Sequence, residues 1–138
     1  MKLSITQAAQ EQINKVYQPD DILVLDFEDG QGPFVDAGAS CQLYPHFRLL
    51  FVPNHFSKDD LAFYDDQLET ELGTVYTKKS SEAFLDKEVR FSVEKSYQRL
   101  QLTSDSGVLA ATVPLKRIEL NEKGQYHGQA SRTNGSSC

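Results

Sequence analysis

Two runs of alternating apolar and polar residues in the second half of the chain admit very few folds. Val89, Phe91 and Val93 alternate with charged and hydroxyl residues, and Leu100 and Leu102 repeat the pattern after the stretch KSYQ. An apolar residue at every second position places one face of a strand toward a core and the other face toward water. The two runs therefore predict an antiparallel hairpin whose five apolar side chains share one core.

Further strands are predicted on both sides of this hairpin. The run ILVLDFE, from Ile22 to Glu28, begins with four apolar residues, so we expect it to be covered on both faces. The stretch MKLSIT at the N-terminus predicts a short first strand. The remaining predicted strands are His46–Val52, Leu68–Leu72, Thr74–Lys78 and Val108–Val113, and the patterned region ends with Ile118 and Leu120.

Helical segments are few. The Thr6 hydroxyl can accept a free backbone N–H, which predicts a helix from Gln7 to Tyr17. Ser80 or Ser81 can cap one or two helical turns that end near Asp86. One N-terminal helix, short helical insertions and many short strands predict an α+β domain. We expect it to be mostly antiparallel β, arranged as a sandwich or rolled sheet.

The length of 138 residues suits a single domain, which we place at residues 1–120. The remainder, NEKGQYHGQASRTNGSSC, contains only Tyr126, Ala130 and Cys138 as apolar residues. Such a segment buries too little surface to offset the entropy lost on ordering. Residues 121–138 are therefore predicted to be a polar, flexible C-terminal tail.

Charge and hydropathy exclude several classes of partner. The net charge of -6 argues against a basic face for nucleic acids or anionic membranes. No apolar run approaches the roughly 20 residues of a membrane span. The N-terminal stretch MKLSITQAAQEQ also lacks the apolar region of a secretory signal. We therefore expect a cytoplasmic protein that binds neither nucleic acid nor membrane.

The loop after the strand ILVLDFE contains Gly30-Gln31-Gly32, which could begin a dinucleotide fingerprint. The third glycine of that fingerprint would fall at Val35, and no helix is predicted to follow. Pro33 also lacks the backbone N–H that a phosphate would accept from. We interpret the two glycines as a turn and expect no cofactor-binding residue there.

Cys41 is the one candidate metal ligand in the sequence. With His46 it forms a Cys-x4-His pair, which is at most half of a tetrahedral site. Catalysis by the same pair would need a third, orienting group, and none is evident, so we expect no catalytic residue. The alternative is that Cys41 is a small buried apolar residue. The second cysteine, Cys138, is the last residue of the predicted tail.

Four stretches in this order resemble the HesB-like, A-type iron–sulfur cluster biosynthesis domain, especially its small Firmicutes branch. They are MKLSITQAAQEQI, ILVLDFEDGQGPF, AFLDKEVRFSV and QRLQLTSDSGVLAATVPL. The first is similar to the short strand and helix that begin the family, and the second to the strand before its first cysteine. The third is similar to a turn with two apolar residues and an aspartate. The resemblance covers Met1 to Leu120 and rests on order and spacing.

The ligands of the family's carriers are missing. Those carriers have a cysteine in the glycine-rich turn and a Cys-Gly-Cys near the C-terminus. By the resemblance, Gln31 occupies the place of the first cysteine, and only Cys138 lies beyond Ile118. Iron–sulfur clusters bind thiolates. The resemblance therefore implies an accessory or binding module that carries no cluster and acts with iron–sulfur assembly proteins.

Two other hypotheses stay open. The chain could bind iron or an iron–sulfur cluster through Cys41 across a homodimer, and two subunits could supply two or four thiolates if Cys138 also takes part. The third hypothesis, a small enzyme built on Cys41 and His46, ranks lowest, and we expect no enzymatic activity.

Overall fold

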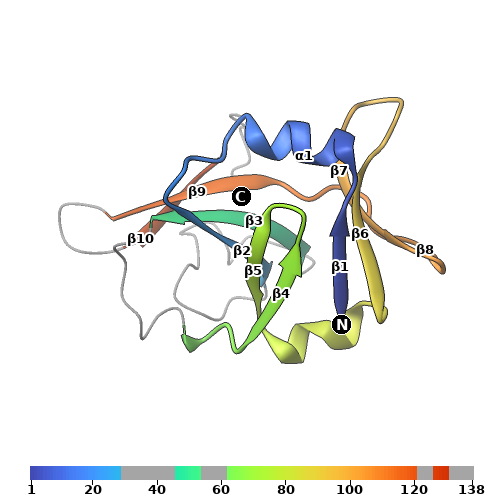
Figure 1. The fold of residues 1–138 in the computed structure, drawn as a ribbon, viewed down its shortest axis with the longest axis horizontal. Helices are drawn as coiled ribbons and strands as arrows, with labels where there is room; N and C mark the ends of the chain where they lie inside the picture. The colour runs from blue at the N-terminus through green and yellow to red at the C-terminus, as the bar shows by residue number, and fades with distance from the viewer. Residues whose placement is uncertain (29–45, 54–61, 121–125, 131–138) are drawn as a thin grey trace, which may run out of the picture.

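Two mixed β-sheets form the frame of the computed structural model, which describes residues 1–28, 46–53, 62–120 and 126–130 (Figure 1). The strands are β1 (Lys2–Ile5), β2 (Asp21–Glu28), β3 (His46–Pro53), β4 (Asp66–Thr70), β5 (Gly73–Thr77), β6 (Glu88–Val93), β7 (Leu100–Ser104), β8 (Gly107–Ala110), β9 (Leu115–Leu120) and β10 (Tyr126–Ala130). The helical segments are α1 (Gln7–Asn14) and a 3-10 helix (Lys79–Phe84). No helix among the described residues is long and apolar enough to cross a membrane.

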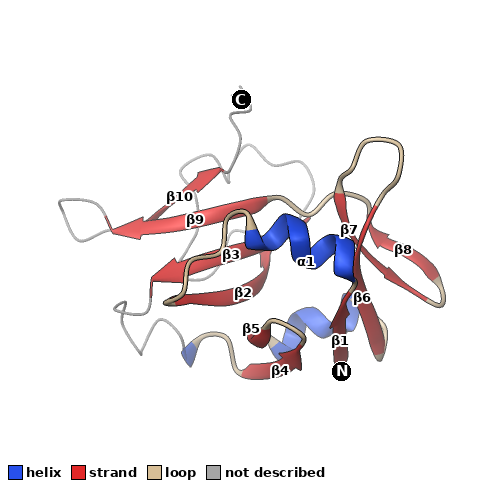
Figure 2. Cartoon of the chain, turned by 45° about the horizontal axis from the view of Figure 1, so that its top comes forward, coloured by secondary structure: helices blue, strands red, loops and turns tan. Residues whose placement is uncertain are grey.

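The smaller sheet has the strand order β1-β6-β7-β8, and the larger has the order β10-β9-β3-β2-β5-β4 (Figure 2). The pairs β1–β6, β2–β5 and β3–β9 are parallel, and the other five described pairs are antiparallel. This arrangement confirms the predicted α+β class with mostly antiparallel pairing.

The predicted hairpin is β6–β7. Phe91 pairs with Leu102 and Val93 with Leu100, and the Glu94 N–H donates to the Arg99 carbonyl across the turn. Gln98 in that turn has a φ of 57°, a left-handed conformation that a tight turn requires. Four of the five predicted core residues are buried, and Val93 packs against the same cluster. The hairpin and its inward face are confirmed.

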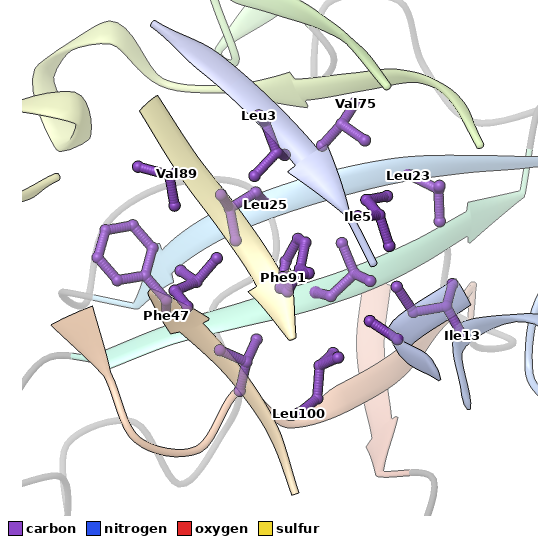
Figure 3. Close-up of a cluster of buried hydrophobic side chains, with 14 of the residues drawn as sticks. Leu3, Ile5, Ile13, Leu23, Leu25, Phe47, Val75, Val89, Phe91 and Leu100 are labelled. Atoms are coloured by element: carbon purple, nitrogen blue, oxygen red, sulfur yellow. The ribbon is translucent and has the colours of Figure 1, made fainter. Parts of the chain in front are cut away.

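The main core lies between the two sheets (Figure 3). Leu3, Ile5, Val89 and Phe91 from the small sheet meet residues of the large sheet such as Leu25. Strand β2 is apolar on both faces because the other face of the large sheet carries a second, smaller cluster. That cluster consists of Val24, Leu50, Val52, Tyr64 and Ile118. The expectation that the run ILVLDFE is covered on both sides is confirmed.

The helix α1 begins as predicted and ends earlier. The Thr6 hydroxyl accepts from the Ala9 N–H at 3.3 Å, and Ala9 and Ile13 are fully buried. The helix stops at Asn14, and the Val16 and Tyr17 N–H groups both bond to the Ile13 carbonyl. The predicted end at Tyr17 is therefore wrong, and the Val16 carbonyl, beyond the end of the helix, accepts from Arg117.

The cap predicted for the second helical segment is also wrong. The 3-10 helix follows Lys78, whose side chain makes no capping hydrogen bond. Ser81 is buried, and its hydroxyl donates to the Lys78 carbonyl at 2.6 Å. The serine therefore satisfies a carbonyl group, and the Lys79 N–H at the start of the helix donates instead to Oδ1 of Asp65 at 2.8 Å.

The prediction of a flexible tail from Asn121 onward is wrong for residues 126–130. These residues form β10, which pairs with β9 from Tyr126 opposite Leu120 to Ala130 opposite Lys116. A strand at the edge of a sheet gains its hydrogen bonds from the backbone, so a polar sequence can add to the sheet with little apolar burial. Residues 131–138 lie outside the described part of the chain.

Candidate functional site

The candidate site lies at the end of β2 and the start of β3, where the segment 29–45 leaves the large sheet and returns to it. The glycine turn with Gln31, the candidate ligand Cys41 and the terminal Cys138 all lie outside the described residues. The frame that holds this segment is described. Phe27 is paired with Phe47 across the two strands, and Asp26 with Arg48.

A buried polar cluster, Asp26–Arg48–Tyr64, lies on the outer face of the large sheet. The Arg48 Nε donates to Oδ2 of Asp26 at 2.7 Å, and the Tyr64 hydroxyl donates to Oδ1 of Asp26 at 2.9 Å. All three residues are at most 3% exposed. Asp26 and Arg48 are paired in the β2–β3 register, and both point away from the main core because side chains alternate along a strand.

The cluster compensates the negative charge of Asp26. A buried carboxylate is costly unless a cation and hydrogen-bond donors replace its water, and here both oxygens of Asp26 have a donor. The cluster therefore holds β2, β3 and the segment before β4 together.

Sequence reasoning missed this cluster, although a signal was present. Each of the two most apolar strands, ILVLDFE and HFRLLFV, has a single charged residue at an inner position, and the two charges have opposite signs. Lone opposite charges in two buried strands indicate that the strands pair with those residues facing each other. Tyr64 carried no such signal.

An aromatic column, Phe47–Phe27–Phe84, lies at the same end of the large sheet. The ring centroids of Phe27 and Phe47 are 4.8 Å apart, and those of Phe27 and Phe84 are 4.7 Å apart with an interplanar angle of 21°. Phe47 is buried, whereas Phe84, the last residue of the 3-10 helix, is 62% exposed. The column leads from the core to the surface.

Asp86 lies just after the 3-10 helix, and its side chain bonds to the turn between β7 and β8. The Ser104 hydroxyl donates to Oδ2 of Asp86, and the Ser106 N–H donates to the Ser104 hydroxyl at 3.1 Å. Hydrogen bonds from Ser104 and then Ser106 lower the pKa of Asp86 below its usual range. This aspartate, in the stretch AFLD of the family resemblance, joins the start of β6 to the β7–β8 turn.

We expect Asp86→Asn to destabilise the protein near neutral pH and to lose this effect in acid. A carboxyl group whose pKa is lower when folded stabilises the fold above its unfolded pKa of about 3.9. That stability is lost as the pH falls through the folded pKa. Thermal unfolding of both proteins at several pH values would measure the difference. Asp105→Asn is the matched control, because Asp105 lies in the β7–β8 turn that Asp86 contacts, and its side chain is 92% exposed. A gap between wild type and Asp86→Asn that is unchanged in acid would contradict the assignment.

The predicted metal ligand, Cys41, lies outside the described residues. Among residues that the structure describes, no group of three or more His, Cys, Asp or Glu side chains could hold a metal ion. His46 begins β3, but its proposed partner Cys41 is not described. Ligation by Cys41 therefore stays a prediction.

Comparison with known proteins gives one family and two structures. A family profile described as iron-sulphur cluster biosynthesis matches residues 1–117. A candidate Fe–S biosynthesis protein from Lactobacillus salivarius, described as having a novel fold, aligns with a TM-score of 0.70 and 24% identity over 85% of this chain and 98% of that chain. A candidate Fe–S biosynthesis protein from Lactobacillus acidophilus aligns with a TM-score of 0.61 and 21% identity over 83% of this chain and 88% of that chain. No curated protein sequence matches. At these identities the two structures establish the shared fold.

Proposed function

The chain belongs to the iron–sulphur cluster biosynthesis family, and we propose that it acts there as an accessory binding module that does not itself carry a cluster. Its partners in this proposal are iron–sulfur assembly proteins, and its setting is the cytoplasm, as expected from the sequence. It acts by binding and positioning rather than by catalysis.

The observation that carries the proposal is the supply of thiolates. The whole chain has two cysteines, Cys41 and Cys138. By the resemblance, Gln31 stands where the family's carriers have their first cysteine, and an amide is a poor substitute for a thiolate at cluster iron. One chain therefore has too few thiolates for the four-cysteine ligation that is usual for such clusters.

The geometry at the base of the segment 29–45 supports a binding role. The Asp26–Arg48–Tyr64 cluster is neutralised internally, and it is at most 3% exposed. Among the described residues, such a cluster fixes the positions of β2, β3 and the segment before β4. The aromatic column next to it brings an exposed ring, Phe84, to the surface.

Anaerobic reconstitution with iron and sulfide tests the proposal. We expect the purified protein to show no thiolate-to-iron charge-transfer absorption after desalting, because one chain has too few thiolates. Bound iron and sulfide would be measured on the same samples, and a four-cysteine ferredoxin would serve as the positive control for the procedure.

The variants Cys41→Ser and Cys138→Ser decide between this proposal and the alternative. Cluster absorption in the wild type that Cys41→Ser abolishes, in a species with the mass of a dimer, would refute the proposal. That result would establish a cluster bound through Cys41 across a homodimer. Absorption that neither variant changes would point to adventitious iron sulfide, and the proposal would stand.

A further inference from the structure

Two carboxyl groups from distant parts of the chain meet where the 3-10 helix packs on β4. Glu82, near the middle of the helix, forms a side-chain hydrogen bond with Asp66, the first residue of β4. The helix begins beside the preceding residue, because the Lys79 N–H donates to Oδ1 of Asp65. Figure 1 and Figure 2 both show this helix next to the start of β1. The helix is therefore attached to the start of β4 at two successive aspartates.

A hydrogen bond between two carboxyl groups requires one proton. Two carboxylates only accept hydrogen bonds, so a pair in contact either shares a proton or is held together against its own repulsion. The Gln67 N–H donates to Oδ1 of Asp66 at 2.9 Å, which favours the charged form of Asp66. The Glu82 side chain is only 17% exposed, and burial disfavours a charge there. These contacts favour the proton on Glu82 and the negative charge on Asp66.

The charged groups around the pair come from three parts of the chain. The Met1 amino group lies 3.8 Å from Oε1 of Glu82, and the charge of Lys79, in the 3-10 helix, acts on Asp66. Asp65, in the segment before β4, opposes the ionisation of Glu82. The two positive charges balance those of Asp65 and Asp66. A negative charge on Glu82 would therefore be left without compensation.

The pKa values of the two groups are moved apart. Burial, and then the hydrogen bond with Asp66, raises the pKa of Glu82, whereas the hydrogen bond with Glu82 lowers the pKa of Asp66. The stability that Glu82 contributes is complete below its unfolded pKa of about 4.3 and is lost as the pH rises through its folded pKa. The stability that Asp66 contributes is complete above its unfolded pKa of about 3.9 and is lost as the pH falls through its folded pKa. The pair is thus strongest in the acidic range where it holds one proton.

We propose that Asp66 and Glu82 form a proton-dependent latch between β4 and the 3-10 helix. The latch is closed while the two carboxyl groups share one proton. When the pH rises and this proton passes to solvent, the two carboxylates repel each other and the helix is held less firmly. The helix carries Phe84, whose ring stacks on Phe27, so an open latch also loosens the outer end of the aromatic column. The inference does not rest on the proposed function.

NMR of the full-length protein tests the latch with two readouts. The Glu82 carboxyl carbon reports the titration. Hydrogen exchange of the Ser81 and Leu85 N–H groups, corrected for the intrinsic rate, reports how firmly the helix is held, because they donate to the Lys78 and Glu82 carbonyls at 2.9 and 3.0 Å. We expect exchange to accelerate as Glu82 titrates, by about tenfold for each pH unit between the Glu82 midpoint and its value in an unfolded chain.

Two isosteric variants separate the shared proton from the loss of a carboxylate. Glu82→Gln supplies a permanent donor to Asp66, so exchange in the helix should no longer depend on the ionisation of this position. Asp66→Asn donates to the Glu82 carboxylate, so the Glu82 midpoint should fall toward its ordinary value. Glu11→Gln makes the same chemical change at an exposed position of α1, and this matched control should leave exchange in the 3-10 helix unchanged.

The latch is overturned if Glu82 titrates with the same midpoint in the wild type and in Asp66→Asn, or if exchange at Ser81 and Leu85 does not follow that titration. The Val113 N–H, which donates to the Leu100 carbonyl at 2.8 Å, belongs to neither β4 nor the 3-10 helix and is the internal reference. Acceleration that Val113 shares would mean that the whole fold loosens, and would also overturn the latch. The result is independent of cluster reconstitution.

Discussion

Replacing Phe91 with alanine is expected to lower the free energy of unfolding by about 3–5 kcal/mol. Phe91 is fully buried, and it extends from β6 into the core between the two sheets (Figure 3). Its removal leaves a cavity that the surrounding strands cannot close without breaking their pairing. Because small domains are stable by only about 5–15 kcal/mol, this one change would remove a large part of the stability.

Urea denaturation of the wild type and Phe91→Ala would measure the effect. Val108→Ala is a suitable control, because Val108 belongs to the same sheet but is 59% exposed. We expect the control to cost less than about 1 kcal/mol. A loss below about 1 kcal/mol for Phe91→Ala as well would mean that the inward face of the hairpin is assigned wrongly.

Replacing Arg48 with methionine should cost about as much, about 3–5 kcal/mol, for a different reason. The change leaves the Asp26 carboxylate buried without its cation, while Tyr64 still donates to the other oxygen. Tyr64→Phe removes one neutral donor and should cost less, about 1–3 kcal/mol. Chemical denaturation of the two variants would establish this order.

The double variant Asp26→Leu with Arg48→Met shows whether the loss comes from an uncompensated charge. We expect the double variant to be more stable than Arg48→Met alone, because a buried ion pair can be replaced by apolar side chains at little cost. A double-mutant cycle gives the interaction energy of the pair. Strictly additive losses would contradict the view that Asp26 and Arg48 act as one unit.

The buried cluster holds the strands from which the segment 29–45 extends, and the aromatic column connects those strands to the exposed Phe84.

Elements whose pattern is local could be read from the sequence. The hairpin β6–β7 has alternation that fixes its inward face, and the cap at Thr6 depends on residues three positions apart. The double-sided burial of β2 follows from its unbroken apolar run. The order and spacing of such elements were sufficient for the family resemblance, which the profile match confirms.

Contacts between distant parts of the chain could not be read in the same way. Arg48 and Tyr64 lie 22 and 38 positions after Asp26, and their contacts with it depend on the β2–β3 register and on the path of the chain before β4. The column of Phe27, Phe47 and Phe84 depends on the same pairing and on the position of the 3-10 helix. The strand β10 is polar and forms because β9 presents an edge of unpaired backbone groups. In each case the contact depends on a pairing between segments that are distant in the sequence. Local propensity carries no information about which segments meet, because the gain from the contact appears only after the chain has closed the loop between them.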